Sequence, residues 1–379
     1  MLPLASTRIR AKSGAIIAAL GEICALAFVG VAGPRSIGSI SAVPPERERQ
    51  GFVLVATLWV LAGLAALAVY IDGMVAADVE RAYLYRQSLQ DELDRRSTES
   101  TLLYLLATGR MSYRGLVLEE KQRFIKSFDD PDLPPGDGEV TMAGEPYRGL
   151  GRMRFSLQDE RGLAPVNIPS SPALGSVLRH AGIAAAEVER ILPRLGDYID
   201  QDHQLSLNGA ERFDYSQLGM PPPANWFLAG PMELKQVLGV GTLLSPAEWR
   251  RLSPLLSVRG AGTYNFNTMH PRVLAAVLDL DRDGVKDVLA ARAERSITRL
   301  SQIAMLTGKY PDIDEESIVM YPSPYVRIAI WPRDGARQWV AGFSLSPGGV
   351  TPWRTEYRYS ELVLNDGTQA AQRAATPLL

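Results

Sequence analysis

Apolar residues form one uninterrupted run near the N-terminal end of the chain, which reads FVLVATLWVLAGLAALAVYI from Phe52 to Ile71. About 20 helical residues at a rise of about 1.5 Å each span about 30 Å, the thickness of the hydrocarbon core of a bilayer. No face of such a helix would be polar, which argues against a buried helix of a soluble domain. We therefore expect this run to cross a membrane.

The apolar run continues into an amphipathic segment, residues 72–110, whose apolar side chains recur at helical spacing. Examples are Val75, Val79, Leu89, Leu93, Leu102 and Leu106. Gly73 is the only breaker between the two segments, and Gly109 is suited to end a helix. The pattern predicts one helix over residues 52–109 that begins in the membrane and continues into the aqueous phase.

The rest of the chain predicts strands, then helices, then strands again. Residues 139–167 alternate in strand fashion, and one buried set would comprise Val140, Met142, Met153, Phe155 and Leu157. Residues 170–306 have a helical pattern, which is cut by turns at 208–209, 221–223 and 259–262. Strand character returns at 325–330, 338–345 and 353–364. A sheet interrupted by a helical insertion fits this order better than two independent domains, so the expected fold class is α+β.

Composition excludes several classes of function. The 379 residues are 46% hydrophobic, which is enough to build a core, and a net charge of −2 provides no drive toward nucleic acid. One cysteine, Cys24, and three histidines exclude a structural zinc site, a disulfide framework and a Cys/His dyad in the body of the chain. Neither a phosphate-binding glycine loop nor a G-x-S-x-G elbow is present, so catalysis finds little support.

A short charged stretch precedes the apolar run and ends in the junction between Gly51 and Phe52. A secretory signal is cleaved after its apolar region, whereas a leader removed here would leave the apolar helix as the new N-terminus. This arrangement resembles the prepilin signal of type IV pilins and type II secretion pseudopilins. The resemblance implies that a prepilin peptidase cleaves after Gly51 and that Phe52 is then N-methylated.

Ala56 is the fifth residue after that junction, where most members of this superfamily carry a glutamate. A carboxylate in the bilayer costs about 2.5–3.5 kcal/mol on insertion scales and needs a partner. The resemblance implies that the partner is the N-terminal amine of the neighbouring subunit above. A subunit without the glutamate suits a position that has no neighbour above it.

A second apolar stretch, residues 15–33, lies upstream and is interrupted by Glu22. It could be a second membrane span, or a conventional signal that ends near Ala32. We favour a third interpretation, in which residues 1–42 precede the true start near Val43 and the leader is short.

Five local motifs follow in a fixed order, and together they resemble the general secretion pathway protein K family of type II secretion minor pseudopilins. They are residues 159–162 (DERG) with Asn167, residues 197–202 (DYIDQD) with 208–211 (NGAE), residues 222–225 (PPAN), residues 232–240 (MELKQVLGV) and residues 265–271 (NFNTMHP). The resemblance covers roughly residues 51–359.

The resemblance implies a pseudopilin fold with a long N-terminal transmembrane and amphipathic helix, an antiparallel sheet and a large helical domain inserted between strands. The expected segments are a leader (1–51), the helix (52–109), the first part of the sheet (110–169), the inserted domain (170–321), and the second part of the sheet with a C-terminal tail (322–379).

Five carboxylates lie within eighteen residues around an Asn-Gly turn: Asp197, Asp200, Asp202, Glu211 and Asp214. Calcium takes six to eight oxygen ligands and would relieve their repulsion. The resemblance to the K family also implies bound calcium in the helical insertion, with a structural role. A solvated acidic loop is the alternative.

Residues 279–284 (DLDRDG) match the first half of a calcium loop, but the twelfth position is Ala290 instead of a bidentate glutamate. We therefore expect Asp281 or Asp283 to cap the helix that follows. Residues 238–241 (LGVG) could form a DNA-binding helix–hairpin–helix turn, but no basic residue follows, so a tight turn between packed helices is expected.

The expected protein is a single-pass inner-membrane minor pseudopilin with a periplasmic body, which lies at the pseudopilus tip and initiates assembly. The implied partners are the I and J minor pseudopilins, the major pseudopilin and a prepilin peptidase. Three alternatives remain: a type IV pilus minor pilin, a membrane-anchored periplasmic enzyme that uses the acidic cluster, and a DNA-binding helix–hairpin–helix protein.

Overall fold

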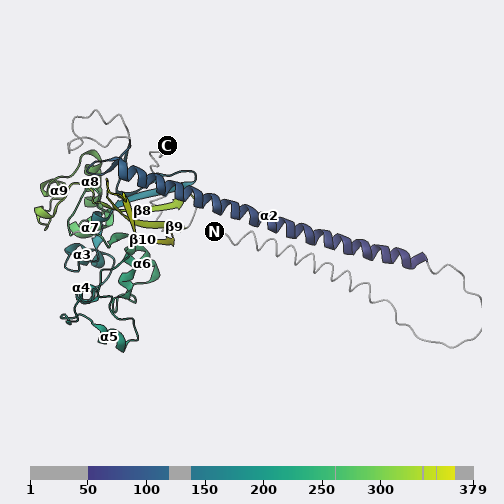
Figure 1. Ribbon diagram of the computed structural model, residues 1–379, viewed down its shortest axis with the longest axis horizontal. Helices are drawn as coiled ribbons and strands as arrows, with labels where there is room; N and C mark the ends of the chain where they lie inside the picture. Colours follow the sequence, from purple (N-terminus) through teal and green to yellow (C-terminus); the bar gives the residue numbers. More distant parts are fainter. Residues whose placement is uncertain (1–49, 119–137, 261, 335–336, 347, 363–379) are drawn as a thin grey trace, which may run out of the picture. The chain divides into compact units, whose positions relative to one another are not determined.

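The computed structural model describes residues 50–118, 138–260, 262–334, 337–346 and 348–362 (Figure 1). Side chains are described from Val53 onward. The chain divides into two units, Met1–Asp78 and Val79–Leu379. The described part of the first unit is helical, and the sheet and the remaining helices belong to the second unit.

The first described element is a single helix, α2 (Gln50–Thr108), as the sequence predicts. It ends where the backbone N–H of Gly109 donates to the Leu105 carbonyl at 2.7 Å. A Cβ on Gly109 would lie 2.5 Å from that same carbonyl oxygen, so the chain needs glycine at this position. In the second unit, Leu102, Leu103 and Leu106 of α2 are buried in a common core with the sheet.

The main sheet has five strands, and every neighbouring pair is antiparallel. The strands are β4 (Ala143–Arg148), β5 (Met153–Asp159), β8 (Tyr325–Pro332), β9 (Arg337–Leu345) and β10 (Trp353–Leu362), in the spatial order β10-β9-β8-β5-β4. The predicted apolar set is buried: Val140, Met142, Met153, Phe155 and Leu157. The alternation in the sequence therefore identified the face of the sheet that packs against α2.

Shorter strands complete the sheet region. β1 (Arg110–Met111), β2 (Gly115–Val117) and β3 (Glu139–Thr141) form a three-stranded antiparallel sheet. β6 (Ala164–Pro165) pairs in parallel with β7 (Leu256–Ser257). Strands of two or three residues are too short to show an alternating pattern, so the sequence did not reveal β1, β2 or β7.

The helical block lies between β5 and β8, two strands that pair directly with each other, from Met153 opposite Pro332 to Asp159 opposite Val326. This position confirms the predicted insertion. Its α-helices are α3 (Pro172–His180), α4 (Ala185–Ile199), α5 (Arg212–Gln217), α6 (Pro246–Leu252), α7 (Pro271–Leu278), α8 (Arg282–Glu294) and α9 (Leu300–Thr307). Short 3-10 turns are η2 (Glu160–Gly162), η3 (Pro231–Gln236), η4 (Ser253–Leu255) and η5 (Glu315–Ser317).

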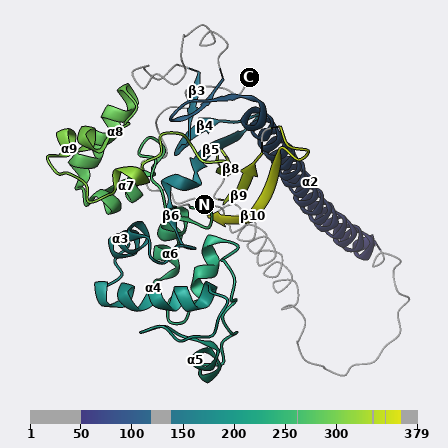
Figure 2. The ribbon, with the colours of Figure 1, turned by 60° about the vertical axis from the view of Figure 1, so that its left-hand side comes forward.

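The inserted block has a hydrophobic core of its own, which includes Leu174, Leu178, Ile191, Tyr215 and Phe266. Figure 2 shows α3, α4 and α5 in one group and α7, α8 and α9 in another, with α5 at the end remote from the sheet. The insertion is thus a packed domain, and α5 with its neighbouring loops forms the far end of that domain.

Candidate interaction and metal sites

α2 is the one helix in the described part of the chain that is long and apolar enough to cross a membrane, and none of its most apolar window is buried. It suggests a single membrane anchor followed by a soluble body. Gly51 and Phe52 lie in the first turn of α2, but their side chains are not among those described, so cleavage between them stays a prediction. The earlier apolar stretch, residues 15–33, and the proposed start near Val43 lie outside the described residues.

Beyond the boundary at Val79, α2 carries exposed apolar side chains before it reaches the sheet. Tyr85, Leu89 and Leu93 follow one another at one-turn intervals and are more than half exposed. The helix then changes character, because Arg95 and Thr98 are buried. An apolar stripe without a cover in the single chain is suited to packing against other helices.

The acidic loop is organised around Asp197, which lies in the last turn of α4 and is completely buried. Its Oδ2 accepts the backbone N–H of Ser206 at 3.2 Å. A Cβ on Gly209 would lie 1.9 Å from the same oxygen, so the Asn208-Gly209 turn approaches the carboxylate as closely as only glycine allows. The loop therefore wraps around this buried carboxylate.

Three carboxylate oxygens of the predicted cluster are buried without a hydrogen-bond partner. They are Asp197 Oδ1, Asp200 Oδ1 and Glu211 Oε1. Burial raises the pKa of Asp200, and the nearby carboxylates of Asp202, Asp197 and Glu211 raise it further. The structure therefore brings four of the five predicted residues close enough to repel one another.

Asp214, unlike the other four residues, neither has an unpartnered buried oxygen nor is among the carboxylates that raise the pKa of Asp200. Its Oδ2 accepts the backbone N–H of Glu211 at 2.9 Å, and the two residues form a capping box at the start of α5. Asp214 thus stabilises the first turn of α5, where the acidic loop ends.

As they stand, the His, Cys, Asp and Glu side chains of the described residues form no group of three or more that could hold a metal ion. The donor chemistry still fits calcium, because the three unpartnered oxygens belong to carboxylates, the ligands that this hard ion prefers. A buried carboxylate oxygen without a partner is also costly. The calcium site therefore stays a prediction, with Asp197, Asp200 and Glu211 as its supported residues.

The acidic motif at residues 279–284 (DLDRDG) forms a helix cap, as the sequence predicts. Asp281 Oδ1 accepts the backbone N–H of Gly284 at 2.8 Å and starts α8. Asp279 adopts a left-handed conformation (φ 49°) and accepts from Lys309 Nζ at 2.8 Å. The first aspartate of this motif, Asp279, is thus paired with the charge of Lys309.

The base of the insertion is held by Asp159, which is completely buried at the end of β5. Its Oδ1 accepts the backbone N–H groups of Arg161 and Ser323, both at 3.1 Å, and its Oδ2 accepts Thr268 Oγ1 at 2.8 Å. Burial raises the pKa of Asp159, although these hydrogen bonds oppose the shift. The residue ties both ends of the insertion and its interior to one strand end.

Glu160, the next residue, pairs with Arg327 of β8, whose Nε lies 3.0 Å from Glu160 Oε1, and both side chains are buried. Arg327 also donates to the Pro254 carbonyl at 2.9 Å and to the Leu256 carbonyl. The Tyr357 hydroxyl of β10 accepts from Arg327 Nε at 2.8 Å and donates to Glu160. Burial opposes the charge on Arg327, but the Glu160 carboxylate outweighs it and raises the pKa of Arg327 well above its usual value.

This pair was not identified from the sequence. The available signal was a charged residue, Arg327, within an otherwise apolar strand. Such a residue on the inner part of a sheet requires a partner.

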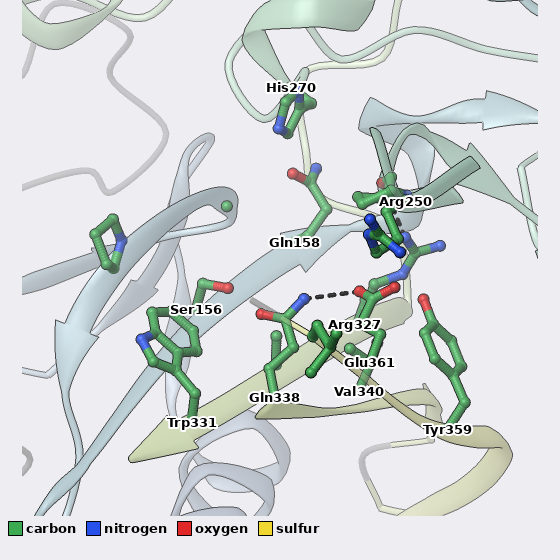
Figure 3. Close-up of a pocket in the computed structure, with 15 residues that line it drawn as sticks. Ser156, Gln158, Arg250, His270, Arg327, Trp331, Gln338, Val340, Tyr359 and Glu361 are labelled. Atoms are coloured by element: carbon green, nitrogen blue, oxygen red, sulfur yellow. Dashed lines mark hydrogen bonds between the residues drawn. The ribbon is translucent and has the colours of Figure 1, made fainter. Parts of the chain in front are cut away.

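A cavity of about 140 Å³ lies where the sheet meets the insertion (Figure 3). Strand residues such as Gln158, Arg327 and Tyr359 line it together with Arg250 and His270 of the insertion. Gln338 Nε2 donates to Glu361 Oε1 at 2.7 Å along its floor.

His270 caps α7, because its Nδ1 accepts the backbone N–H of Arg272 at 3.2 Å. Burial lowers the pKa of His270 to about 3, and nearby arginines contribute to the shift. It is therefore neutral at physiological pH.

The glycine pair of the possible DNA-binding turn lies between η3 and α6. Gly239 has a φ of 81°, and a Cβ on Gly241 would lie 2.7 Å from the Lys235 carbonyl oxygen. This geometry confirms the predicted tight turn, although its first flanking helix is a 3-10 helix.

Comparison with known proteins gives matches to a family model and to solved structures. Residues 156–261 match the family model described as "Type II secretion system (T2SS), protein K". The fold is similar to a chain in the crystal structure of the GspK–GspI–GspJ complex from the enterotoxigenic Escherichia coli type 2 secretion system, with a TM-score of 0.50 and 17% sequence identity. That match covers 75% of this chain and 100% of the other chain. No curated protein sequence matches the chain.

The family model begins within β5 and extends past β7, so it falls on the motifs from Asp159 to Val240. At 17% identity the second match shows the fold, which is the expected helix, sheet and insertion. Residues 156–261 are thus similar to a type II secretion protein K domain, and the fold agrees with the predicted resemblance.

Proposed function

We propose that this chain, which carries a type II secretion protein K domain, lies at the tip of a pseudopilus and starts its assembly. In this role, α2 anchors it in the inner membrane, and its soluble body lies in the periplasm. Its contribution is to assembly for protein export across the outer membrane, and it performs no catalytic step.

The observation that carries this proposal is the position of the insertion. The helical block enters between two directly paired strands, so a domain with its own core is added to a sheet that still packs on α2. A subunit of this kind can enter a bundle of similar helices while its body obstructs the addition of a further subunit.

Ala56 supports the same position in the assembly. It lies four residues beyond Phe52 in α2, where a carboxylate would be required to pair with the amine of a subunit above. An alanine makes no such bond and leaves no charge to be compensated in the bilayer. The subunit can therefore begin a filament without a partner on that side.

The partners we propose are the I- and J-type minor pseudopilins and then the major pseudopilin. The solved complex with a similar chain contains GspK, GspI and GspJ. In the present chain, the exposed stripe of Tyr85, Leu89 and Leu93 on α2 supplies an apolar surface for such helices.

Maturation tests this proposal directly. We expect the chain recovered from membranes to begin at an N-methylated Phe52, and Gly51→Val to abolish cleavage because a bulky residue replaces the glycine at the junction. Intact mass and N-terminal sequencing measure both. An unchanged mature mass in Gly51→Val would rule out prepilin processing and leave an ordinary anchored protein.

We further propose that calcium binds the acidic loop through Asp197, Asp200 and Glu211, with Asp202 nearby. The ion would neutralise these carboxylates and stabilise the loop, since three of their oxygens are buried without a partner. Calcium should raise the melting temperature of the full chain in detergent, and Asp200→Ala with Asp202→Ala should remove most of that shift.

Asp283→Ala is the matched control, because its carboxylate lies on α8, outside the loop. Equal calcium-dependent shifts in the wild type and the double variant would leave the loop as a solvated acidic segment. A shift lost equally in Asp283→Ala would place the ion elsewhere.

A further inference from the structure

The end of the insertion that is remote from the sheet exposes large apolar side chains. They are Leu205, Leu207, Phe213, Leu218, Trp226 and Phe227, each more than half exposed, with Leu207 at 88% and Phe213 at 70%. Such side chains scattered singly are ordinary, whereas six of them within a short stretch of one domain are a candidate interaction surface. We refer to these six residues as the distal apolar surface.

Contacts hold the three segments that carry this surface together. Asn225, the residue before Trp226, donates from Nδ2 to the Asp202 carbonyl at 3.0 Å and lies 3.2 Å from His203 Nδ1. His203 and Phe213 line the same open hollow beside α5. The loop that carries Leu205 and Leu207 is fastened to α4 through the bond from Ser206 to Asp197. The apolar side chains therefore project from one supported region.

The same region is strongly acidic. Residues 197–233 contain six carboxylates and one arginine, Arg212, which gives a formal net charge of −5. The carboxylates belong to Asp197, Asp200, Asp202, Glu211, Asp214 and Glu233. One bound calcium ion would reduce this charge to about −3 and would not reverse it. The surface is thus apolar in its side chains and negative in its surroundings.

We propose that the distal apolar surface docks a segment of another polypeptide in which apolar side chains are flanked by lysine or arginine. The apolar side chains of the partner would cover Leu207, Phe213 and Trp226, and its cations would lie against the acidic loop. Apolar burial supplies affinity, and opposite charge supplies selectivity.

Two other occupants fit the charge less well. Membrane surfaces that attract proteins are anionic, and a patch with a net charge of −5 is repelled from them. Two copies of this chain that met through the same patch would place their acidic loops against each other. A cationic segment is the occupant that both features favour.

The test uses the full chain in phosphatidylcholine nanodiscs and three fluorescent synthetic peptides. The first has a Leu-Trp-Phe centre flanked by lysines, the second has the same centre flanked by glutamates, and the third has a serine centre flanked by lysines. Binding is measured by fluorescence anisotropy in EDTA and again in calcium, so that the outcome does not depend on the proposed metal site.

We expect the first peptide to bind at least about tenfold more tightly than either of the others. Leu207→Ser or Phe213→Ser should weaken it about tenfold, because each removes one side chain that binding would bury. The control is Met305→Ser on α9, an apolar residue that is 78% exposed but lies outside the surface, and it should leave binding unchanged.

Equal binding of the lysine- and glutamate-flanked peptides would overturn the proposal, as would an equal loss in Met305→Ser. Nanodiscs of brominated lipid test the membrane alternative: because Trp59 in the membrane run is quenched in either case, a smaller quenched fraction in Trp226→Phe than in the wild type would assign the surface to the bilayer. Self-association that Leu207→Ser abolishes, measured by sedimentation, would assign it to a second copy. Each of these results is independent of cleavage at Gly51.

Discussion

The buried pair between Glu160 and Arg327 should be a principal determinant of the stability of the soluble body. The substitution that tests it is Arg327→Met, which keeps an unbranched apolar stem and removes the guanidinium. Glu160, with its side chain 1% exposed, would then be a buried carboxylate without a counterion. The carbonyls of Pro254 and Leu256 would each lose a donor.

The magnitude follows from these losses. Breaking a buried ion pair by removing one partner costs about 3–5 kcal/mol. The two carbonyls that lose their donor add about 1 kcal/mol each, and the Tyr357 hydroxyl, which continues to donate to Glu160, offsets an amount of the same size. We therefore expect the free energy of unfolding of Arg327→Met to fall by about 3–5 kcal/mol at neutral pH.

Urea unfolding of the full chain in detergent, followed by tryptophan fluorescence, measures this difference. Arg190→Met is the matched control, because Arg190 Nη1 lies 2.6 Å from Glu187 Oε1 on α4 with side chains that are 52% and 34% exposed. Such an exposed pair is worth less than about 1 kcal/mol. Adding Glu160→Gln to Arg327→Met should recover part of the stability, since no unpaired charge would then be buried.

The reasoning would be refuted if Arg327→Met and Arg190→Met shifted the urea midpoint equally. It would also be refuted if the added Glu160→Gln made Arg327→Met less stable, because the cost would then lie in packing and not in an uncompensated charge.

Three further predictions concern the insertion. Gly209→Ala should lower the free energy of unfolding by about 1–3 kcal/mol, since the added Cβ would meet the Asp197 carboxylate. Gly196→Ala on α4 is the control, because a Cβ there has open space and should not destabilise the protein. Thermal unfolding compares the two variants. Because the pKa of Asp200 is raised, the fold favours its protonated carboxyl, and this contribution to stability is present below the ordinary aspartate pKa and is lost as pH rises. Asp200→Asn, which carries no charge at any pH, should therefore raise the melting temperature in EDTA by more at pH 7 than at about pH 4. Asp281→Ala should cost about 1 kcal/mol through loss of the α8 cap and leave any calcium-dependent shift unchanged, as differential scanning calorimetry would show.

Periodicity and length made the main elements predictable. The run from Phe52 to Ile71 is too long and too uniformly apolar for a soluble helix, and Phe155 and Leu157 mark the buried face of β5 by simple alternation. The insertion was predictable because strand patterns flank a helical block. These features depend on residues that are close together in the sequence, so the sequence alone is enough to reveal them.

The ion pair and the composition of the acidic cluster depend on neighbours in space. Glu160 and Arg327 are separated by 167 residues, and only the pairing of β5 with β8 brings them together. Proximity in sequence likewise grouped Asp214 with the other carboxylates, although a capping box holds it at the start of α5. Local spacing cannot distinguish a ligand from a helix cap when both are short acidic side chains.

The pairing of β5 with β8 also explains how so large an insertion leaves the sheet intact. The chain departs at Asp159 and returns at Val326, which lie opposite each other in register, so the insertion has to bring together two ends that the sheet already fixes. Closing a longer loop adds only about 0.6 kcal/mol for each doubling of its length, and the core of the insertion compensates for that cost.

Two closed ends alone would still act as a hinge. Asp159 bonds to Ser323 and Thr268, and Arg327 bonds to Glu160 and to the carbonyls near η4, so the insertion is fastened to β5 and β8 at several separate points. A hinge with that many buried polar bonds cannot open without exposing unpaired groups. The insertion should therefore move with the sheet as one body, which lets a force applied through α2 reach the distal apolar surface.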